Sequence, residues 1–366
     1  MSDYRIFVVN PGSTSTKVGL FEGEKKIFSS NVSHDAEELK KFTDIMDQLP
    51  YRVDTINKEL KTAGIKLEHI DACVGRGGGL MPVKGGTYRA NELMLDHARR
   101  GANGVIHPAQ LGIPIATAFA EEFHCPVFAV NPPDVDEYEP IARITGIKGV
   151  YRQSHLHSLN LKETAIRHSK LMGVKYEDCN YIVCHIGGGI SISAHHKGRM
   201  IDGNDIVTGE GPMAPTRCGE VPVSETIKLC SAEGGGSVKQ LCLKNGGLVS
   251  HLDTSDAREV LKMIEHGDKY AELIWDAMIY QITKYIGAMA SVLKGDVDAI
   301  LLGGGLVYSE DLVCKIKESC SYLAPVYAYP GEFEMEAMAS GAIRVLTGEE
   351  KAKVYTAEPV WKGLQD

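Results

Sequence analysis

The chain has 366 residues, of which 43% are apolar and 24% charged, and 39 lysines and arginines against 48 aspartates and glutamates give a formal net charge of -9. This length exceeds what one hydrophobic core usually holds, so the sequence predicts two domains, or two lobes around a cleft. The acidic balance argues against general nucleic-acid binding, and an anionic ligand would need backbone amides and a few locally placed cations.

The cysteines and the apolar segments indicate a cytoplasmic protein. The nine cysteines contain no C-x-x-C pair and no regular spacing, which favours reduced thiols. Residues 1–5 lead directly into an apolar strand, without the features of a signal peptide. The longest candidate span, 277–293, is interrupted by Gln281 and Lys284 and is shorter than the roughly 20 apolar residues that cross a bilayer. We therefore expect no membrane crossing.

The chain opens with a strand, a polar loop and a second strand. The run YRIFVV at 4–9 is rich in β-branched and aromatic residues, the cluster 10–17 is typical of a turn, and a second strand covers 18–21. The further elements predicted up to residue 172 are helical periodicity over 36–62 broken by Pro50, helices near 107–123 and 157–172, and strands at 71–74 and 126–130.

The same strand, loop and strand return half a chain later. The apolar run 181–186 leads through glycines 187–189 into an alternating segment that we expect to be a half-buried strand. The elements predicted after it are four helical segments between 223 and 293, a strand at 298–302, a loop at 303–305, and a strand plus helix at 326–346. The duplication predicts two similar α/β lobes, with both hairpin loops directed into a cleft between them.

The loops fit neither of two common nucleotide-binding motifs. The first lacks the glycine that precedes the lysine of a P-loop, and residues 187–189 open a strand, not the helix of a dinucleotide-binding fold. Backbone amides with the hydroxyls of Ser13, Ser15 and Thr16 could still surround a polyphosphate, with Lys17 as a point charge. Ordinary tight turns are the alternative for either loop alone, but their paired occurrence after buried strands favours phosphate binding.

Six segments in chain order resemble those of the acetate and butyrate kinases, and the butyrate kinases more closely. They are NPGSTSTK at 10–17, VGRGGG at 74–79, HLHSLN at 155–160, HIGGG at 185–189, GEGPMAPTR at 209–217 and PGEFEM at 330–335. The likeness extends over nearly the whole chain. It implies the fold of the actin-like ATPase superfamily, with duplicated actin-like (ribonuclease H-like) lobes and a nucleotide cleft between them. The N-terminal lobe would comprise 1–153, joined by the C-terminal helix at about 336–356, and the nucleotide-binding lobe 154–335.

The resemblance also implies an activity. It predicts reversible, in-line transfer of a phosphoryl group from ATP to butanoate, giving butanoyl phosphate and ADP, with Mg²⁺ as cofactor and at least a homodimer as the assembly. Isobutyrate, acetate or propionate are alternative substrates, and an actin-like ATPase that transfers no phosphate is an alternative class. A sugar or glycerol kinase would need a carboxylate base for the hydroxyl proton, and the sequence offers no clear candidate.

The nucleotide-binding residues follow from the resemblance. One phosphate loop would contain Asn10, Ser13, Ser15 and Lys17, and the other His185, Gly187, Gly188 and Gly189. The residues expected at the nucleoside are Gly303, Gly304, Gly305, Asp256 and Arg258. For the last two residues, a helix N-cap beside an exposed arginine is an equal alternative on spacing alone.

The chemistry explains the predicted catalytic residues. A carboxylic acid is already ionised at neutral pH, so the site needs cations that bring two anions together, and no general base. Arg76 and Arg217 suit that need, because they are surrounded by small residues and can hold paired oxygens. A structural salt bridge is the alternative for each, and we favour the functional role. The resemblance implies that His157 contacts the transferred phosphoryl group. His155 is the alternative.

The metal ligands are less clearly marked. The resemblance implies a glutamate ligand near 331–335, for which we predict Glu334, with Glu332 as the alternative and Asn10 as a further ligand. Where acetate kinases have an aspartate after the strand at 127–130, this chain has Asn131. Asp134 or Asp136 could take a supporting role toward the metal, or the position could be unimportant.

The glycines after Arg76 bear on substrate size. Acetate kinases follow this arginine with two valines that bound the acyl pocket, whereas this chain has Gly77, Gly78 and Gly79. Additional room would favour a four-carbon acid, since each buried methylene contributes roughly 0.8 kcal/mol. The alternative is that the turn itself requires glycine. His107 is a weaker candidate for the acid-binding side.

Overall fold

The computed structural model describes residues 4–363 and divides the chain into two compact units. The first unit combines the residues up to 136 with those from 333 onward, and the second spans 137–332. The sequence predicted domain boundaries at 153/154 and 335/336. They stay predictions, because a compact unit of the structure need not coincide with a domain.

The first unit contains a seven-stranded sheet and the helices that cover it. Its strands are β1 (Arg5–Pro11), β2 (Ser15–Glu22), β3 (Lys25–Ser33), β4 (Ala72–Gly75), β5 (Thr87–Arg89), β6 (Val127–Val130) and β12 (Lys353–Val354). Its helices are α1 (Ala36–Leu39), η1 (Ile45–Asp47), α2 (Gln48–Thr62), α3 (Glu92–Arg100), η2 (Pro108–Leu111), α4 (Gly112–Phe123) and α12 (Glu334–Leu346).

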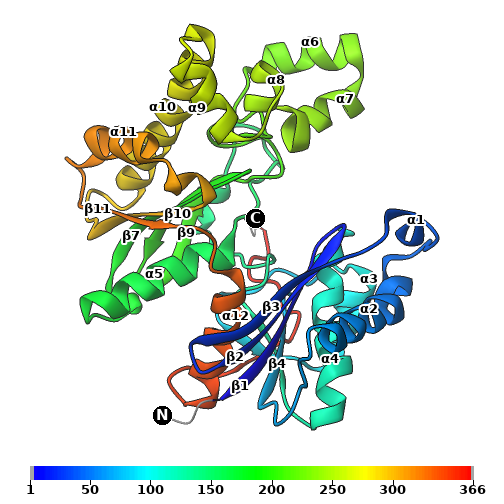
Figure 1. Ribbon diagram of the computed structural model, residues 1–366. Coiled ribbons are helices and arrows are strands. Elements are labelled where there is room, and N and C mark those ends of the chain that lie inside the picture. The colour runs from blue at the N-terminus through cyan, green and yellow to red at the C-terminus, as the bar shows by residue number, and fades with distance from the viewer. Residues whose placement is uncertain (1–3, 364–366) are drawn as a thin grey trace. The chain divides into compact units, whose positions relative to one another are not determined.

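The strand order in this sheet is β12-β5-β6-β4-β1-β2-β3. Strands β1, β2 and β3 form an antiparallel meander, and β4 and β6 join parallel beside β1. Helices α4 and α12 pack on opposite faces (Figure 1). Because both faces are covered, β4 and β6 are buried along their whole length.

A close backbone approach positions the beginning of α4 on the sheet. A Cβ added at Gly75 would lie 2.3 Å from the carbonyl oxygen of Gly112, and one added at Gly112 would lie 2.7 Å from the amide nitrogen of Arg76. Both positions therefore require glycine, and α4 begins directly against the strand end that leads into Arg76.

The second unit contains a five-stranded sheet. Its strands are β7 (Asn180–Ile186), β8 (Ile190–His196), β9 (Arg199–Gly203), β10 (Ala299–Gly304) and β11 (Val326–Pro330). Its α-helices are α5 (Ser158–Met172), α6 (Val223–Glu233), α7 (Gly235–Gln240), α8 (Leu248–Leu252), α9 (Ala257–Glu265), α10 (Lys269–Val292) and α11 (Glu310–Cys320). Its shorter turns of helix are η3 (Pro140–Arg143), η4 (Tyr176–Asp178), the π-helical η5 (Leu241–Asn245) and η6 (Gly305–Tyr308).

The second sheet repeats the topology of the first. Its order is β11-β10-β7-β8-β9, in which β7, β8 and β9 form an antiparallel meander and β10 and β11 join parallel beside β7. Helices α5 and α10 pack on its two faces (Figure 1). Helix α10 buries Trp275, Met278 and Ile282, and each such side chain stabilises the unit by about 1.5–3 kcal/mol. The predicted duplication of an α/β unit is therefore present in the topology.

The hairpin turns are shorter than the sequence predicted. Strand β1 continues through Asn10 to Pro11 and β2 begins at Ser15, so the turn is confined to residues 12–14. Strand β10 likewise includes Gly303 and Gly304. Turn-forming residues are held in strand conformation here because a neighbouring strand pairs with them, as Gly303 pairs with His185.

Two helical predictions need correction. Pro50 lies in the first turn of α2, where its missing N–H has no intrahelical partner, and the break falls instead at residues 40–44. Between residues 223 and 293, all of which the structure describes, there are five α-helices and one π-helical turn where the sequence predicted four segments. Short glycine-bounded helices are difficult to separate from loops by periodicity.

The prediction that the strand after Gly189 is half-buried is wrong. Six of the seven residues of β8 are buried, and Ser191, Ser193 and His195 are inaccessible to solvent. The alternating polar side chains face α5 and the turns beside it, where they form hydrogen bonds, rather than water. Among the described residues, no helix is both long and apolar enough to span a membrane.

Candidate active site

Asn10, Arg76 and Asn131 lie at or directly after the ends of parallel strands in the first unit. The register pairs Val9 with Gly75 and Gly75 with Ala129, so β1, β4 and β6 end at the same edge of the sheet. Asn10, Arg76 and Asn131 therefore lie along one edge. The carboxyl ends of parallel strands are where ligands bind in open α/β sheets.

Asn10 and Glu334 are in direct contact at this edge. Asn10 Nδ2 donates a hydrogen bond of 2.8 Å to Oε2 of Glu334, the first residue of α12. The pair offers an amide oxygen and a carboxylate, the ligand types that Mg²⁺ prefers beside substrate phosphates and water. Within residues 4–363 no group of three or more His, Cys, Asp or Glu side chains could hold a metal ion. The pair thus fits a metal that a nucleotide carries into the site.

Arg76 is buried and has weak hydrogen bonding. Its Nη1 reaches the backbone oxygen of Asn131 only at 3.5 Å, and within the described residues it forms no ion pair. Burial lowers the pKa of its guanidinium, and the charges of Glu334 and Asp134 partly oppose that shift. A buried cation without a close counter-ion is an expected feature of an anion site.

Asn131 and its neighbours have structural contacts. Asn131 adopts a left-handed conformation with φ of 38°, and its Oδ1 accepts a 2.7 Å hydrogen bond from the amide of Gly86. Asp134 Oδ1 accepts from Leu80 N and Asn103 Nδ2, and burial raises the pKa of Asp134 to about 7. The backbone of Asp136 pairs with Val83. A supporting role of these acids toward a metal stays a prediction.

The glycines after Arg76 do not leave the additional room that the sequence suggested. Gly77, Gly78 and Gly79 have φ values of 73°, 148° and 70°, which side chains rarely adopt. A Cβ at Gly77 would meet Pro132 at 3.0 Å, and one at Gly78 would meet Ala109 at 3.1 Å. The turn itself therefore requires glycine, and other residues occupy the space.

His107 also has a local structural role. It caps the short helix η2, and its Nδ1 accepts a 3.2 Å hydrogen bond from the amide of Ala109. Burial and the charge of Arg76 both lower the pKa of His107. Its assignment to substrate stays a prediction, as do those of Gly77 and Gly78.

A buried arginine that no sequence motif indicated supports the hairpin between β1 and β2. Arg52 of α2 is completely buried, and its guanidinium donates hydrogen bonds to the backbone oxygens of Gly12, Ser13 and Ser15. Ser13 and Lys17 are exposed on the hairpin, and Ser15 is partly exposed. The signal that could have revealed Arg52 is its spacing, because α2 buries residues 52, 56 and 60, one face of a helix.

His157 and His185 are stacked in the second unit. Their ring centroids lie 4.1 Å apart, and His157 Nδ1 lies 2.8 Å from the hydroxyl of Ser191 on β8. His185 Nε2 lies 3.8 Å from Oε1 of Glu332. His155 instead pairs with Asp205, at 2.8 Å. The structure therefore brings His157, and not His155, beside the glycine loop.

Arg217 lies against that glycine loop. A Cβ added at Gly189 would lie 1.2 Å from Arg217 Nη1, and Thr216 Oγ1 donates a 2.9 Å hydrogen bond to the backbone oxygen of Gly188. The Nε and Nη1 atoms of Arg217 are buried and have no hydrogen-bond partner among the described residues. Burial lowers the pKa of this guanidinium. Two buried donors without acceptors indicate a place for an anion.

The glycines at the ends of β7 and β10 lie at one edge of the second sheet. Gly303 pairs with His185, so residues 187–189 and 303–305 lie at neighbouring strand ends. Gly188 and Gly305 have no other heavy atom within 4 Å of an added Cβ, whereas one at Gly304 would lie 2.4 Å from the backbone oxygen of Ile186. The open positions provide backbone surface for a ligand, and Gly304 is required for packing.

Asp256 and Arg258 do not join this group. Asp256 is the N-cap of α9, and its carboxylate pairs with the exposed guanidinium of Arg258 at 2.5 Å. This arrangement is the alternative left open by the sequence, and a contact with the nucleoside stays a prediction.

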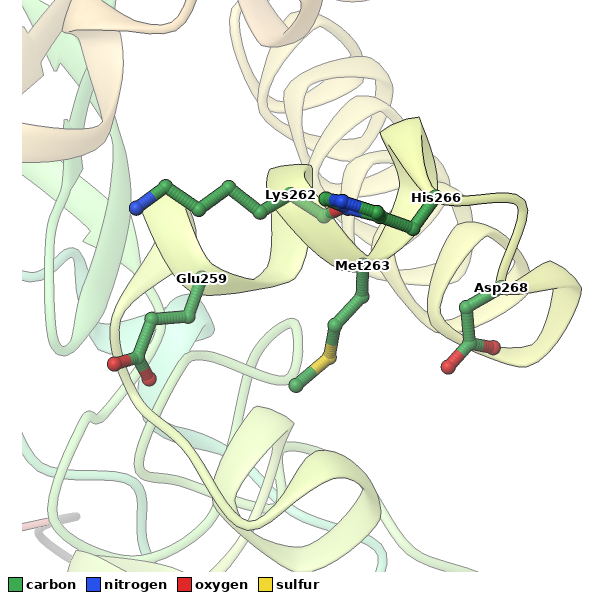
Figure 2. A pocket seen from close by; sticks show the side chains of 5 residues that line it. All are labelled: Glu259, Lys262, Met263, His266 and Asp268. Carbon is green, nitrogen blue, oxygen red and sulfur yellow. The ribbon is translucent and has the colours of Figure 1, made fainter.

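Farther along the same helix, Figure 2 shows a hollow in the surface. The residues that line it are Glu259, Lys262, Met263, His266 and Asp268.

Known proteins share much of this sequence. The family model of the acetokinase family matches residues 138–323. A probable butyrate kinase of Clostridium botulinum (strain Eklund 17B / Type B) is 44% identical over 96% of this chain and 99% of its own. Probable butyrate kinase 2 of Caldanaerobacter subterraneus subsp. tengcongensis is 45% identical over the same shares. The chain belongs to the acetokinase family.

Solved structures show the fold of this acetokinase family member. Acetate kinase of Porphyromonas gingivalis has a TM-score of 0.74 at 19% identity, covering 94% of this chain and 100% of that one. Acetate kinase of Entamoeba histolytica has a TM-score of 0.74 at 18% identity, covering 93% and 99%. The predicted family and the α/β fold class with duplicated actin-like lobes are confirmed.

Proposed function

We propose that this acetokinase family member transfers the γ-phosphoryl group of ATP reversibly to a short-chain carboxylate, with butyrate as the substrate. The names of the relatives support the choice of butyrate. The observation that carries the proposal is Arg217, whose buried Nε and Nη1 have no acceptor within the described residues and which lies against a glycine loop. A hydrolase that only orients water would have little use for such a guanidinium.

In the proposed reaction an ionised carboxylate oxygen attacks the γ-phosphorus of ATP. An oxygen–phosphorus bond forms to the acid as the bond to the ADP oxygen breaks, and no proton has to be removed from the nucleophile. The barrier is then the approach of two anions. Arg217 and Arg76 are proposed to lower it, because buried guanidinium groups hold planar oxygen pairs and balance their charge.

His157 is proposed to donate a hydrogen bond to an equatorial oxygen of the transferred phosphoryl group. The contact of its Nδ1 with Ser191 fixes the orientation of the ring, which supports Nε2 as the donor. A donor that is already in position stabilises charge in the transition state without reorganisation. His185, stacked on His157, limits movement of that ring.

Asn10 and Glu334 are the residues that would hold Mg²⁺. When bound, the metal would neutralise charge on the phosphate oxygens. Glu332, the alternative, belongs to the second unit and lies close to His185. The nucleotide phosphates are assigned to the hairpin that includes Ser13, Ser15 and Lys17, and to glycines 187–189. The adenosine is assigned to glycines 303–305.

A homodimer and a cytoplasmic location complete the proposal. Leu273 and Tyr280 are 62% and 65% exposed, and they lie seven residues apart on one face of α10. Exposed apolar side chains on one face support a subunit interface, which sedimentation can test. The nine free thiols support a reducing compartment.

A hydroxamate assay for acyl phosphate tests the proposed function. The enzyme is supplied with ATP and Mg²⁺ and, in parallel, acetate, propionate, butyrate or isobutyrate. If the amount of product is greatest with butyrate, the proposal is supported. If it is greatest with isobutyrate or acetate, that acid is the substrate in place of butyrate. If no acid yields acyl phosphate while ATP still binds, the chain is an actin-like ATPase that transfers no phosphate.

A further inference from the structure

The hairpin between β1 and β2 directs its backbone oxygens toward one buried side chain. Arg52 Nη1 donates to the oxygens of Gly12 and Ser15, at 3.0 and 3.4 Å, and Nη2 donates to that of Ser13 at 3.4 Å. Arg52 Nη1 also donates to Thr16 Oγ1 at 3.0 Å. A single guanidinium thus binds three of the four carbonyl groups from residue 12 to residue 15.

The other end of the guanidinium is fixed as well. Gln48 Oε1, one helical turn earlier on α2, accepts from Arg52 Nε at 3.1 Å and from Nη2 at 2.9 Å. His34 supports the opposite side, since its backbone amide donates to Thr14 O at 2.9 Å and its Nε2 lies 2.7 Å from Thr16 Oγ1. These contacts hold the plane of the guanidinium in a single orientation, in which its N–H donors face the carbonyl oxygens of the hairpin.

The direction of the carbonyl groups determines the direction of the amides. In a trans peptide unit the C=O and N–H bonds point in opposite directions. The oxygens of Gly12 and Ser13 point at Arg52, so the N–H groups of Ser13 and Thr14 point away from it, toward the exposed side of the turn. Within residues 4–363 neither N–H donates to a protein acceptor. Successive amides of this kind form an anion-binding concavity.

We infer that Arg52 is a positioning residue that turns the amides of the first hairpin toward nucleotide phosphate. It contacts the carbonyl side of the turn and so acts on the phosphate only through the backbone. This inference rests on the proposed function, because it takes the hairpin to be a phosphate loop. It adds a residue to which the sequence motif gives no role.

Substitutions of Arg52 can distinguish an effect on the position of the hairpin amides from an effect on the stability of the folded protein. Arg52→Lys keeps the positive charge but replaces the planar fork by a single ammonium, and Arg52→Met removes both. Ile56→Ala is the matched control, because Ile56 is also completely buried on α2, one turn further along, and its apolar side chain donates no hydrogen bond to the hairpin. Equilibrium binding of ATP, ADP and adenosine is measured for each protein, together with its melting temperature.

The expected result is selective for phosphate. Arg52→Lys should bind ATP and ADP about tenfold more weakly, the factor for one lost charge-assisted hydrogen bond, with adenosine binding unchanged. Arg52→Met should be weaker still, so that lysine rescues part of the loss. Ile56→Ala should melt at a lower temperature but bind all three ligands as the wild type does.

Two outcomes would overturn the inference. One is that Arg52→Lys binds ATP as tightly as Ile56→Ala does, and the other is that adenosine binding falls in the same proportion as ATP binding. If Arg52→Met does not fold, the lysine variant still decides. Binding requires no turnover, so a wild type that makes no acyl phosphate would contradict the proposed function without altering the test of Arg52.

Discussion

Arg217 and Gly189 are packed so closely that a side chain at residue 189 would have to displace the guanidinium of Arg217. A Cβ there would lie 1.2 Å from Arg217 Nη1 and 2.5 Å from its Cζ. The glycine loop after β7 therefore has two roles in this account. It presents backbone to the nucleotide, and it provides the surface against which Arg217 is held.

Gly189→Ala should displace the guanidinium of Arg217. We expect kcat/KM for the carboxylate to fall at least about a hundredfold, because small misplacements of a positioning group have effects of that size. The double variant with Arg217→Ala provides the control. Without the guanidinium the added methyl group has nothing to displace, so the two changes together should be no worse than Arg217→Ala alone. Additive losses would contradict the close contact.

Ser191→Ala should lower kcat by roughly tenfold, because one hydrogen bond that orients His157 is lost. The KM for ATP should remain unchanged. Ser193→Ala is the matched control, since Ser193 is equally buried two residues along β8 but bonds to His195. Steady-state kinetics of both variants, with His157→Gln for reference, test the assignment. Equal losses in the two serine variants would indicate a general effect on the strand.

Glu334→Gln should raise the Mg²⁺ concentration needed for half-maximal activity by about tenfold, the effect expected when a metal ligand is weakened. The control is Glu336→Gln, in the same first turn of α12, whose carboxylate pairs with Lys26 on the surface. Titration of activity with Mg²⁺ at fixed ATP compares the two. If Glu332→Gln shifts the Mg²⁺ titration and Glu334→Gln does not, Glu332 is the metal ligand and Glu334 is not.

Asp134 should make the stability of the protein depend on pH. Its folded pKa of about 7 lies above its ordinary value of 3.8, so its contribution is fully present below the unfolded pKa and is lost as the pH rises through 7. From about pH 5.5 to pH 7 this amounts to 1.5 units at 1.4 kcal/mol each, or about 2 kcal/mol.

Asp134→Asn should remove that loss, because the amide does not ionise. Urea denaturation at about pH 5.5 and pH 8.5 should show a more stable variant at both, with a difference that is about 2 kcal/mol larger at the higher pH, because both lie above the unfolded pKa of 3.8. The buried histidines titrate alike in both proteins, so the difference isolates Asp134. A constant difference between the two proteins would contradict the raised pKa.

Much of the fold could be predicted because apolar runs are local signals. Strands β1 and β7, with the turns that follow, were located from their β-branched residues, and their repetition predicted the duplicated topology. The sequence could not show that Gly303 and Gly304 belong to β10, since only a partner strand makes extended glycines stable. The burial of β8 was hidden for a similar reason, because Ser191 and Ser193 have distant hydrogen-bond partners.

The candidate site could be predicted only in part. Motifs indicated Arg76, His157 and Arg217, but residues that act through the backbone carry no motif. Arg52 is separated from the hairpin by about forty residues, and its contacts depend on how α2 packs. The glycines after Arg76 were interpreted as space for substrate, whereas their positive φ values show a conformational requirement that one sequence cannot distinguish from lost volume.

The most direct test of the central claim is kcat/KM for butyrate at saturating ATP in Arg217→Ala, with melting temperature and adenosine affinity measured on the same sample. We expect a loss of at least about a hundredfold, since a partly buried charge that pairs with a ligand is removed, while folding and adenosine binding persist. An unchanged kcat/KM for butyrate in a folded variant would contradict the assignment of this buried guanidinium to the carboxylate.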